Sequence, residues 1–132
     1  MWNKKISSGG LVSAMSCLKS KMKWVGYVGM DIPKDERPKV KELLFEINCI
    51  PVFIKKGSLI KILELYDLYY NGFSNDVLWP VLHYTHILVN TLIKEEEYWN
   101  AYVAVNKLFF KAIQENLTDI GSVWIHGTNN NY

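Results

Sequence analysis

Residues 69–80 carry the side-chain types that bind sugars. They read YYNGFSNDVLWP, with aromatic rings, amides and hydroxyls close together around a glycine and a proline. An aromatic ring can cover the C–H face of a sugar, while fixed polar groups bind its hydroxyls. A tyrosine hydroxyl or an indole N–H can also donate to a phosphate oxygen. The segment indicates a sugar or sugar-phosphate site. An aromatic-rich loop anchored in the core is the structural alternative, above all for Phe73 and Leu78.

A glycine pair, Gly9 and Gly10, stands directly before a predicted helix. Glycines allow the backbone to approach a ligand closely, and the unpaired N–H groups at a helix start favour phosphate. The pair therefore indicates a phosphate-binding loop. A tight turn without any ligand explains the same residues and is the more frequent use of such a pair.

Three histidines, His83, His86 and His126, raise the question of a metal site. His83 and His86 have a spacing that suits one face of a helix, but no acidic or thiol side chain lies at a matching spacing. The residue order also shows neither a Ser–His–Asp arrangement nor a pair of catalytic carboxylates. We therefore predict no metal centre and no hydrolytic triad.

Strand-like and helix-like segments alternate along the chain, which is typical of a parallel sheet covered by helices. Three short apolar runs predict strands at residues 24–28, 50–54 and 122–125. They fit buried strands of a parallel sheet, which read as continuous apolar runs.

Helical periodicity predicts helices over residues 11–21, 38–48, 58–69 and 94–117. The last is the longest, with apolar and aromatic residues at alternating spacings of four and three. These residues are Tyr98, Tyr102, Val105, Phe109 and Ala112. Residues 70–86 mix aromatic residues with Gly, Asn and Pro, so periodicity predicts no regular element there.

The 132-residue chain is long enough for one domain with a core, and its 49% hydrophobic and 21% charged composition is that of a globular protein. A net charge of +2 is too small to indicate nucleic acid or an anionic membrane. Cys17 and Cys49 stand in apolar runs without a CxxC pair, so we expect reduced thiols. No apolar run is long enough for a signal or spanning segment, and we expect a cytoplasmic protein.

Several short motifs occur in an order that resembles the N-terminal half of the trehalose-6-phosphate synthases, glycosyltransferase family 20. The resemblance runs from about Ser7 to His126, and YYNGFSN-x-x-LWP is its most specific part. In order, the motifs are SSGGLVSA, WVGYVGMDIP, IPVF, YYNGFSNDVLWPVLHY, WNAYVAVN and VWIH.

The resemblance implies an α/β fold, namely a partial Rossmann-like N-terminal domain of a two-domain GT-B glycosyltransferase with a parallel sheet flanked by helices. It implies retaining transfer of glucose from UDP-glucose to glucose 6-phosphate, giving trehalose 6-phosphate, without a metal or other cofactor. Tyr70 and Trp79 are similar to residues that contact the acceptor glucose 6-phosphate. Gly9 and Gly10 are similar to the glycine pair that approaches the donor UDP-glucose. Further synthase or phosphatase subunits are the protein partners that such a family member would have.

Three departures from the family pattern bear on activity. The family's first strand, whose arginine holds the acceptor phosphate, has no counterpart before the glycine pair. Gly127 occupies the position of an aspartate that contacts the acceptor sugar, and the donor-nucleotide domain has no counterpart. We therefore expect residues 1–132 to form an incomplete acceptor-side domain that is inactive alone. The alternatives are a non-catalytic module that binds a sugar phosphate or associates with full-length synthase, and a decayed gene product.

Overall fold

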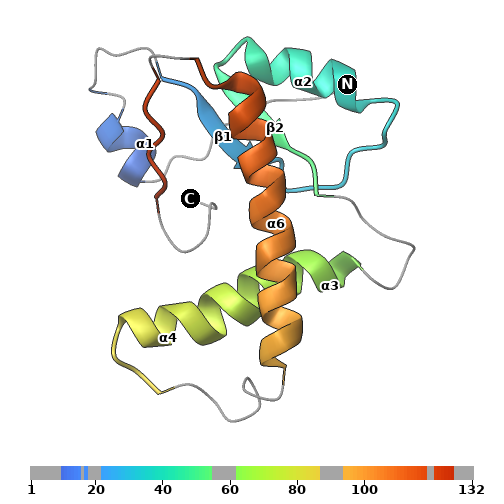
Figure 1. Cartoon of the computed structure of the whole chain (residues 1–132). Helices are drawn as coiled ribbons and strands as arrows, with labels where there is room; N and C mark the ends of the chain where they lie inside the picture. Colours follow the sequence, from blue (N-terminus) through green and yellow to red (C-terminus); the bar gives the residue numbers. More distant parts are fainter. Residues whose placement is uncertain are drawn as a thin grey trace.

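A computed structural model describes residues 10–15, 17, 22–54, 62–86, 94–118 and 121–126. Within these ranges the chain is a mixed α/β structure, and Figure 1 shows how its elements are arranged. In chain order they are α1 (Gly10–Met15), β1 (Trp24–Tyr27), α2 (Arg37–Phe45), β2 (Cys49–Val52), α3 (Ile62–Asp67), the π-helix η1 (Leu68–Leu78), α4 (Trp79–Leu82) and α6 (Glu95–Asn116).

β1 and β2 are parallel neighbours, and α2 makes the connection between them. Trp24 lies opposite Cys49 and Tyr27 opposite Val52. Two adjacent parallel strands need a crossover connection, and α2 supplies it with Val40 buried beneath. The predictions of strands at 24–28 and 50–54 and of a helix from about residue 38 are confirmed, and so is a parallel sheet with helices.

The prediction of a third strand at residues 122–125 is wrong. Residues 121–126 form neither strand nor helix, and Trp124 and Ile125 are each 75% exposed. An apolar run becomes a strand only where a neighbouring strand takes up its N–H and C=O groups. In the part of the chain that the structure describes, β1 and β2 pair with each other and this segment joins neither.

α3, η1 and α4 follow one another without a break and form one helical stretch from Ile62 to Leu82. In η1 the backbone bonds from residue i to i+5, and at its end the N–H of Trp79 donates to the carbonyl of Ser74. The helix predicted at 58–69 is confirmed for residues 62–67, and residues 58–61 lie outside the described ranges. Residues 70–86, for which no element was predicted, contain most of η1 and all of α4.

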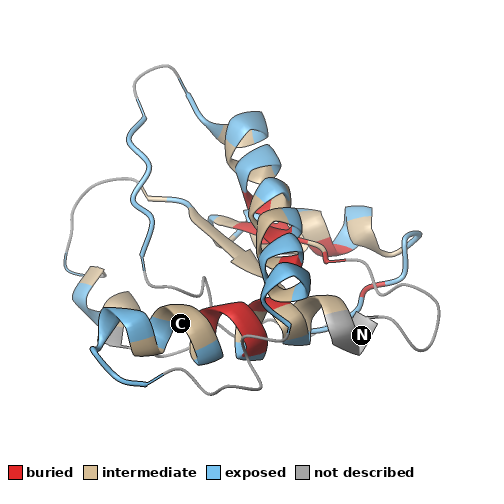
Figure 2. Cartoon of the chain, turned by 60° about the horizontal axis from the view of Figure 1, so that its bottom comes forward, coloured by how far each residue is buried: buried red, intermediate tan, exposed pale blue. Residues whose placement is uncertain are grey.

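α6 confirms the long helix predicted at 94–117, and it packs on both the sheet and η1. Figure 2 shows buried residues on the side of α6 that faces the sheet and in the middle of η1, where the two helices cross. The core combines Ala101, Val105 and Phe109 of α6 with Val52, Ile54 and Tyr69. The sheet and the π-helix are therefore held together through one face of α6.

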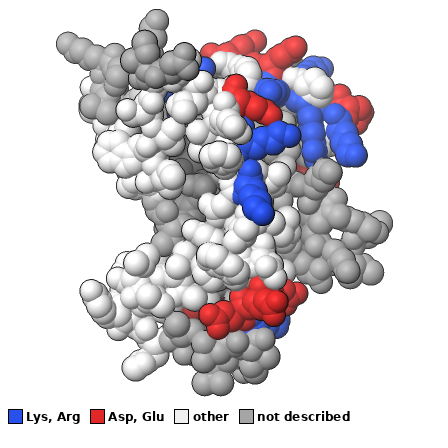
Figure 3. Space-filling view, viewed as in Figure 1, with Lys and Arg blue, Asp and Glu red and all other residues white. Residues whose placement is uncertain are grey.

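Charged side chains are unevenly distributed over the surface. In the view of Figure 3, blue and red groups gather over α2, and a red group covers the lower end of α6. That end carries Glu95, Glu96 and Glu97 in its first turn, which suits the positive end of the helix dipole. A largely uncharged surface lies between these regions.

Candidate functional site

Three tyrosines from separate elements lie ring against ring in a row that we call the tyrosine ladder: Tyr27, Tyr66 and Tyr70. The rings of Tyr66 and Tyr70 are stacked, with centroids 5.5 Å apart and an interplanar angle of 10°. The ring of Tyr66 in turn lies 4.9 Å from that of Tyr27. The ladder therefore links the start of η1, through α3, to the end of strand β1.

The ladder lies where an α/β sheet commonly binds its ligand. Tyr27 is the last residue of β1, and it lies opposite Val52, the last residue of the parallel strand β2. Ligands of open α/β sheets bind outside the carboxyl ends of the strands. Through Tyr66, the structure thus connects Tyr70, the predicted acceptor-binding residue, to the strand end at which a ligand is expected.

The ladder supplies aromatic faces and hydroxyl donors. Tyr70 and Tyr27 are both half-buried. Burial, followed by the negative charge of Asp31, raises the pKa of Tyr27 above its ordinary value, so its hydroxyl remains a protonated donor further into the alkaline range. Sequence reasoning missed Tyr27, because nothing in a short apolar strand indicates that its last side chain will meet a helix far along the chain.

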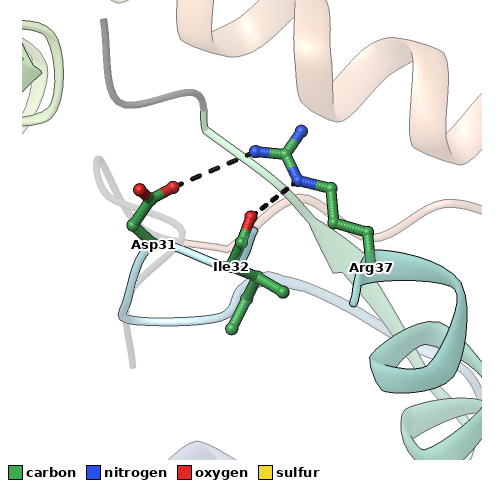
Figure 4. A network of polar contacts seen from close by, with 3 residues as sticks. All are labelled: Asp31, Ile32 and Arg37. Carbon is green, nitrogen blue, oxygen red and sulfur yellow. Dashed lines mark hydrogen bonds and ion pairs between the residues drawn. The ribbon is translucent and has the colours of Figure 1, made fainter. Parts of the chain in front are cut away.

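Arg37 fixes the loop that follows β1. Its Nε donates to the carbonyl oxygen of Ile32 at 3.0 Å, and a terminal nitrogen lies 3.9 Å from Asp31. The guanidinium also lies over the ring of Phe53, 5.2 Å from the centroid. Figure 4 shows Arg37 reaching from the start of α2 to both loop residues. Because Phe53 follows β2, these contacts hold the carboxyl ends of both strands in a fixed arrangement beside the ladder.

The structure places Trp79 in a different environment from Tyr70. Trp79 begins α4 and is 45% exposed. Its ring stacks on His83, with centroids 3.9 Å apart, and His83 Nδ1 lies 2.8 Å from the Trp79 carbonyl oxygen. Tyr70 instead stacks on Tyr66. The two predicted acceptor residues thus belong to separate aromatic contacts, and their joint binding of one ligand stays a prediction.

The predicted donor-binding glycines are only partly described. Gly10 is the first residue of α1, which confirms a helix start at the glycine pair, whereas Gly9 and Gly127 lie outside the described ranges. α1 forms no extended contact with η1 among the described elements. The donor role of the pair stays a prediction.

Two shallow depressions lie on α6, away from the ladder. One, of about 400 Å³, is lined by Lys94, Glu96, Glu97 and Asn100. The other, of about 280 Å³, is lined by Trp99, Tyr102, Val103, Asn106, Lys107 and Phe110. Among the residues with a described structure, no three His, Cys, Asp or Glu side chains gather as metal ligands would. No described helix is long and apolar enough to cross a membrane.

A mixed α/β chain with an aromatic, hydroxyl-bearing site at the ends of parallel strands suits sugar chemistry, and comparison with known proteins agrees. Residues 1–128 match the model of glycosyltransferase family 20, so the chain belongs to this family. It is 43% identical to alpha,alpha-trehalose-phosphate synthase (UDP-forming) A of Dictyostelium discoideum over 126 residues, 95% of this chain and 16% of that protein.

Other relatives carry the same name. The chain is 44% identical over 123 residues to the synthase of Schizosaccharomyces pombe, covering 91% of this chain and 22% of that protein. It is 39% identical over 124 residues to the 56 kDa subunit of the Saccharomyces cerevisiae synthase, covering 92% of this chain and 23% of the relative. The chain thus spans about a sixth to a quarter of the length of such relatives, from 16% to 24%.

Proposed function

We propose that this chain forms the acceptor-sugar side of a trehalose-6-phosphate synthase, which transfers glucose from UDP-glucose to glucose 6-phosphate with retention of configuration. The synthases to which it is similar are much longer than this chain. Glycosyl transfer needs donor and acceptor held together, with positive charge or helix dipoles at the departing diphosphate. We therefore expect the 132 residues to contribute acceptor binding and to catalyse no transfer by themselves.

The tyrosine ladder is the observation that carries this proposal. Its end residue, Tyr70, belongs to the most specific family motif and stacks at 5.5 Å on Tyr66, beside the carboxyl end of β1. A phenol held by stacking can offer its ring face to a sugar and its hydroxyl to a phosphate oxygen without losing side-chain entropy on binding.

Titration of the purified chain with glucose 6-phosphate, followed by NMR or calorimetry, tests acceptor binding. We expect saturable binding with a dissociation constant on the order of 1 mM, typical of a small polar ligand on part of a site. Tyr70→Ala abolishes it. Tyr70→Phe keeps the ring stack but removes the hydroxyl, and weakens binding by about 3- to 10-fold.

The matched control is Tyr84→Phe, since the Tyr84 side chain is 99% exposed and has no part in the ladder. This variant should bind as the unchanged chain does. Circular dichroism of each variant shows whether the fold is retained. Absence of saturable binding, or equal binding by folded Tyr70→Ala, would contradict acceptor binding at the ladder.

A binding module without catalysis is the second candidate, and Gly127 at the position of the family's sugar-contacting aspartate favours it. An assay of UDP release from UDP-glucose and glucose 6-phosphate separates the two functions. It is run with this chain alone and with this chain added to a related synthase from which the region matching residues 1–128 has been deleted. Transfer restored by the mixture supports a synthase part, whereas binding without restored transfer supports the module. Turnover by the 132-residue chain alone would show that the acceptor-side assignment is incomplete.

A further inference from the structure

The face of α6 that points away from the core carries two adjacent rows of residues. The opposite face is buried through Ala101, Val105 and Phe109. The first row has alternating steps of four and three, with Trp99 and Phe110 exposed and Val103 and Asn106 half-buried between them. The second row consists of exposed residues, namely Glu97, Asn100, Ala104, Lys107 and Lys111.

The first row has the geometry of a helix-packing seam. Steps of four and three are the spacing of the a and d positions through which two helices pack along their length. Trp99 is 50% and Phe110 64% exposed, and the shallow depression of about 280 Å³ runs along the row between them. Large aromatic side chains so exposed on one helix face indicate an interaction surface.

This seam is self-complementary when two copies of α6 run antiparallel. A two-fold axis near its midpoint places Trp99 of one copy opposite Phe110 of the other, and Val103 opposite Asn106. The amide nitrogen of Asn106 donates to the Tyr102 carbonyl oxygen at 2.8 Å, so one of its two N–H groups is already paired within the helix. The same patch then serves both partners, as a two-fold interface requires.

The second row is complementary in the same arrangement. Glu97 comes to lie opposite Lys111 of the other copy, and Asn100 opposite Lys107, while the small Ala104 lies at the axis and permits close approach. A parallel arrangement would instead align Glu97 with Glu97 and Lys111 with Lys111. Figure 3 shows this polarity, with a red group at the lower end of α6 and blue groups above it. Antiparallel packing also opposes the two helix dipoles favourably.

One existing contact competes with this pairing only weakly. Lys111 lies 3.9 Å from Glu115 one turn further along, and both side chains are more than half exposed. Exposed ion pairs of this kind contribute little, so the ammonium group remains available to a partner.

We propose that this face of α6 binds the same face of a second copy of the chain, as an antiparallel two-fold dimer. The contact is confined to one helix of about 33 Å and so belongs to the small, transient class of interfaces. We expect a dissociation constant on the order of 10 µM, weakened by salt. The inference is independent of sugar binding, because neither row includes a residue of the tyrosine ladder.

Sedimentation equilibrium or light scattering of the whole chain, from about 1 to 500 µM, tests the proposal around the expected dissociation constant. The unchanged chain should dimerise over this range. Phe110→Ala should weaken the dimer at least about tenfold without unfolding the monomer, because this ring is mostly exposed. Lys39→Glu on α2, an exposed residue outside both rows, is the matched charge control and should leave the dimer unchanged.

Charge reversal tests the antiparallel register directly. Glu97→Lys alone and Lys111→Glu alone each create two like-charge pairs in the dimer and should weaken it by about tenfold. An equimolar mixture of the two variants restores opposite charges at both pairs, so a mixed dimer should form at least as tightly as the original. A chain that stays monomeric at about 500 µM, a dimer unaffected by Phe110→Ala, or a mixture no tighter than its parts would overturn the proposal. Binding of this face only to the remaining part of a longer family member would do the same.

Discussion

Gly72 of η1 is buried against the side chain of Tyr98 of α6. A Cβ atom at this position would lie 2.6 Å from Cδ1 and 2.7 Å from Cε1 of Tyr98, and 3.0 Å from its Cγ. Carbon atoms in contact are normally 3.5–4.0 Å apart, so Gly72→Ala requires a displacement of about 1 Å. Because Cγ is among the contacted atoms, moving only the tip of the ring does not relieve the clash.

Two effects of opposite sign determine how much Gly72→Ala changes the free energy of unfolding. Overpacking of a buried contact costs about 1–3 kcal/mol, whereas replacing glycine by alanine inside a helix gains up to about 1 kcal/mol. We expect Gly72→Ala to lower the free energy of unfolding by about 1–2 kcal/mol. For a chain of this length that corresponds to a fall in Tm of about 4–8 °C.

Urea and thermal unfolding followed by circular dichroism measure this change. In a Tyr98→Ala background the clash is gone, so adding Gly72→Ala should be neutral or stabilising by up to about 1 kcal/mol. Asp76→Ala, at an exposed position of the same helix, should change stability by less than about 0.5 kcal/mol. If Gly72→Ala is neutral or stabilising beside an intact Tyr98, the packing of η1 against α6 described above is incorrect.

Other substitutions test the core, the loop after β1 and the thiols. Val105 has no exposed surface, so Val105→Ala should lower the free energy of unfolding by about 2 kcal/mol in a urea titration. Val81 is 53% exposed, so Val81→Ala should change the free energy of unfolding by less than about 0.5 kcal/mol. Arg37→Lys should cost about 1 kcal/mol and speed amide exchange in the loop after β1, because lysine cannot keep the Nε bond while lying over the ring of Phe53; unchanged exchange would contradict this. Burial raises the pKa of the Cys49 thiol, so at pH 8 it should react with a disulfide reagent more slowly than the exposed Cys17, and comparison of the two single Cys→Ser variants measures the difference.

The elements that sequence predicted correctly are those defined by local patterns. α6 is long, amphipathic and acidic in its first turn, so its helical periodicity identifies the helix even where its predicted ends differ from the observed ends by a residue. β1 and β2 are short continuous apolar runs on either side of a helix, a pattern that packs in few ways. Residues 122–125 have the same local pattern but no neighbouring strand among the described residues, and pairing is a property of the fold rather than of the run.

η1 escaped prediction because of its composition. Its buried residues Tyr69, Gly72 and Phe73 do have the i, i+3, i+4 spacing of a helix face, but the Gly, Asn and Pro residues around them are typical of a loop. The ladder was missed for another reason, since Tyr27 and Tyr70 are linked through the ring of Tyr66 in α3. No spacing in the sequence encodes a contact of this kind.

The π-helix reconciles the two interpretations of YYNGFSNDVLWP, since core packing is confirmed on one side of the helix and the proposed site lies on another. One side packs against α6 through Tyr69, Gly72 and Phe73, with the ring of Phe73 4.7 Å from that of Tyr102. Another side presents Tyr70 to the ladder. If Tyr70 binds the acceptor as proposed, the motif is constrained twice, by packing on one side and by the ligand on the other. Because one stretch of backbone fixes both sides, displacement of η1 at Gly72 should also weaken sugar-phosphate binding at Tyr70.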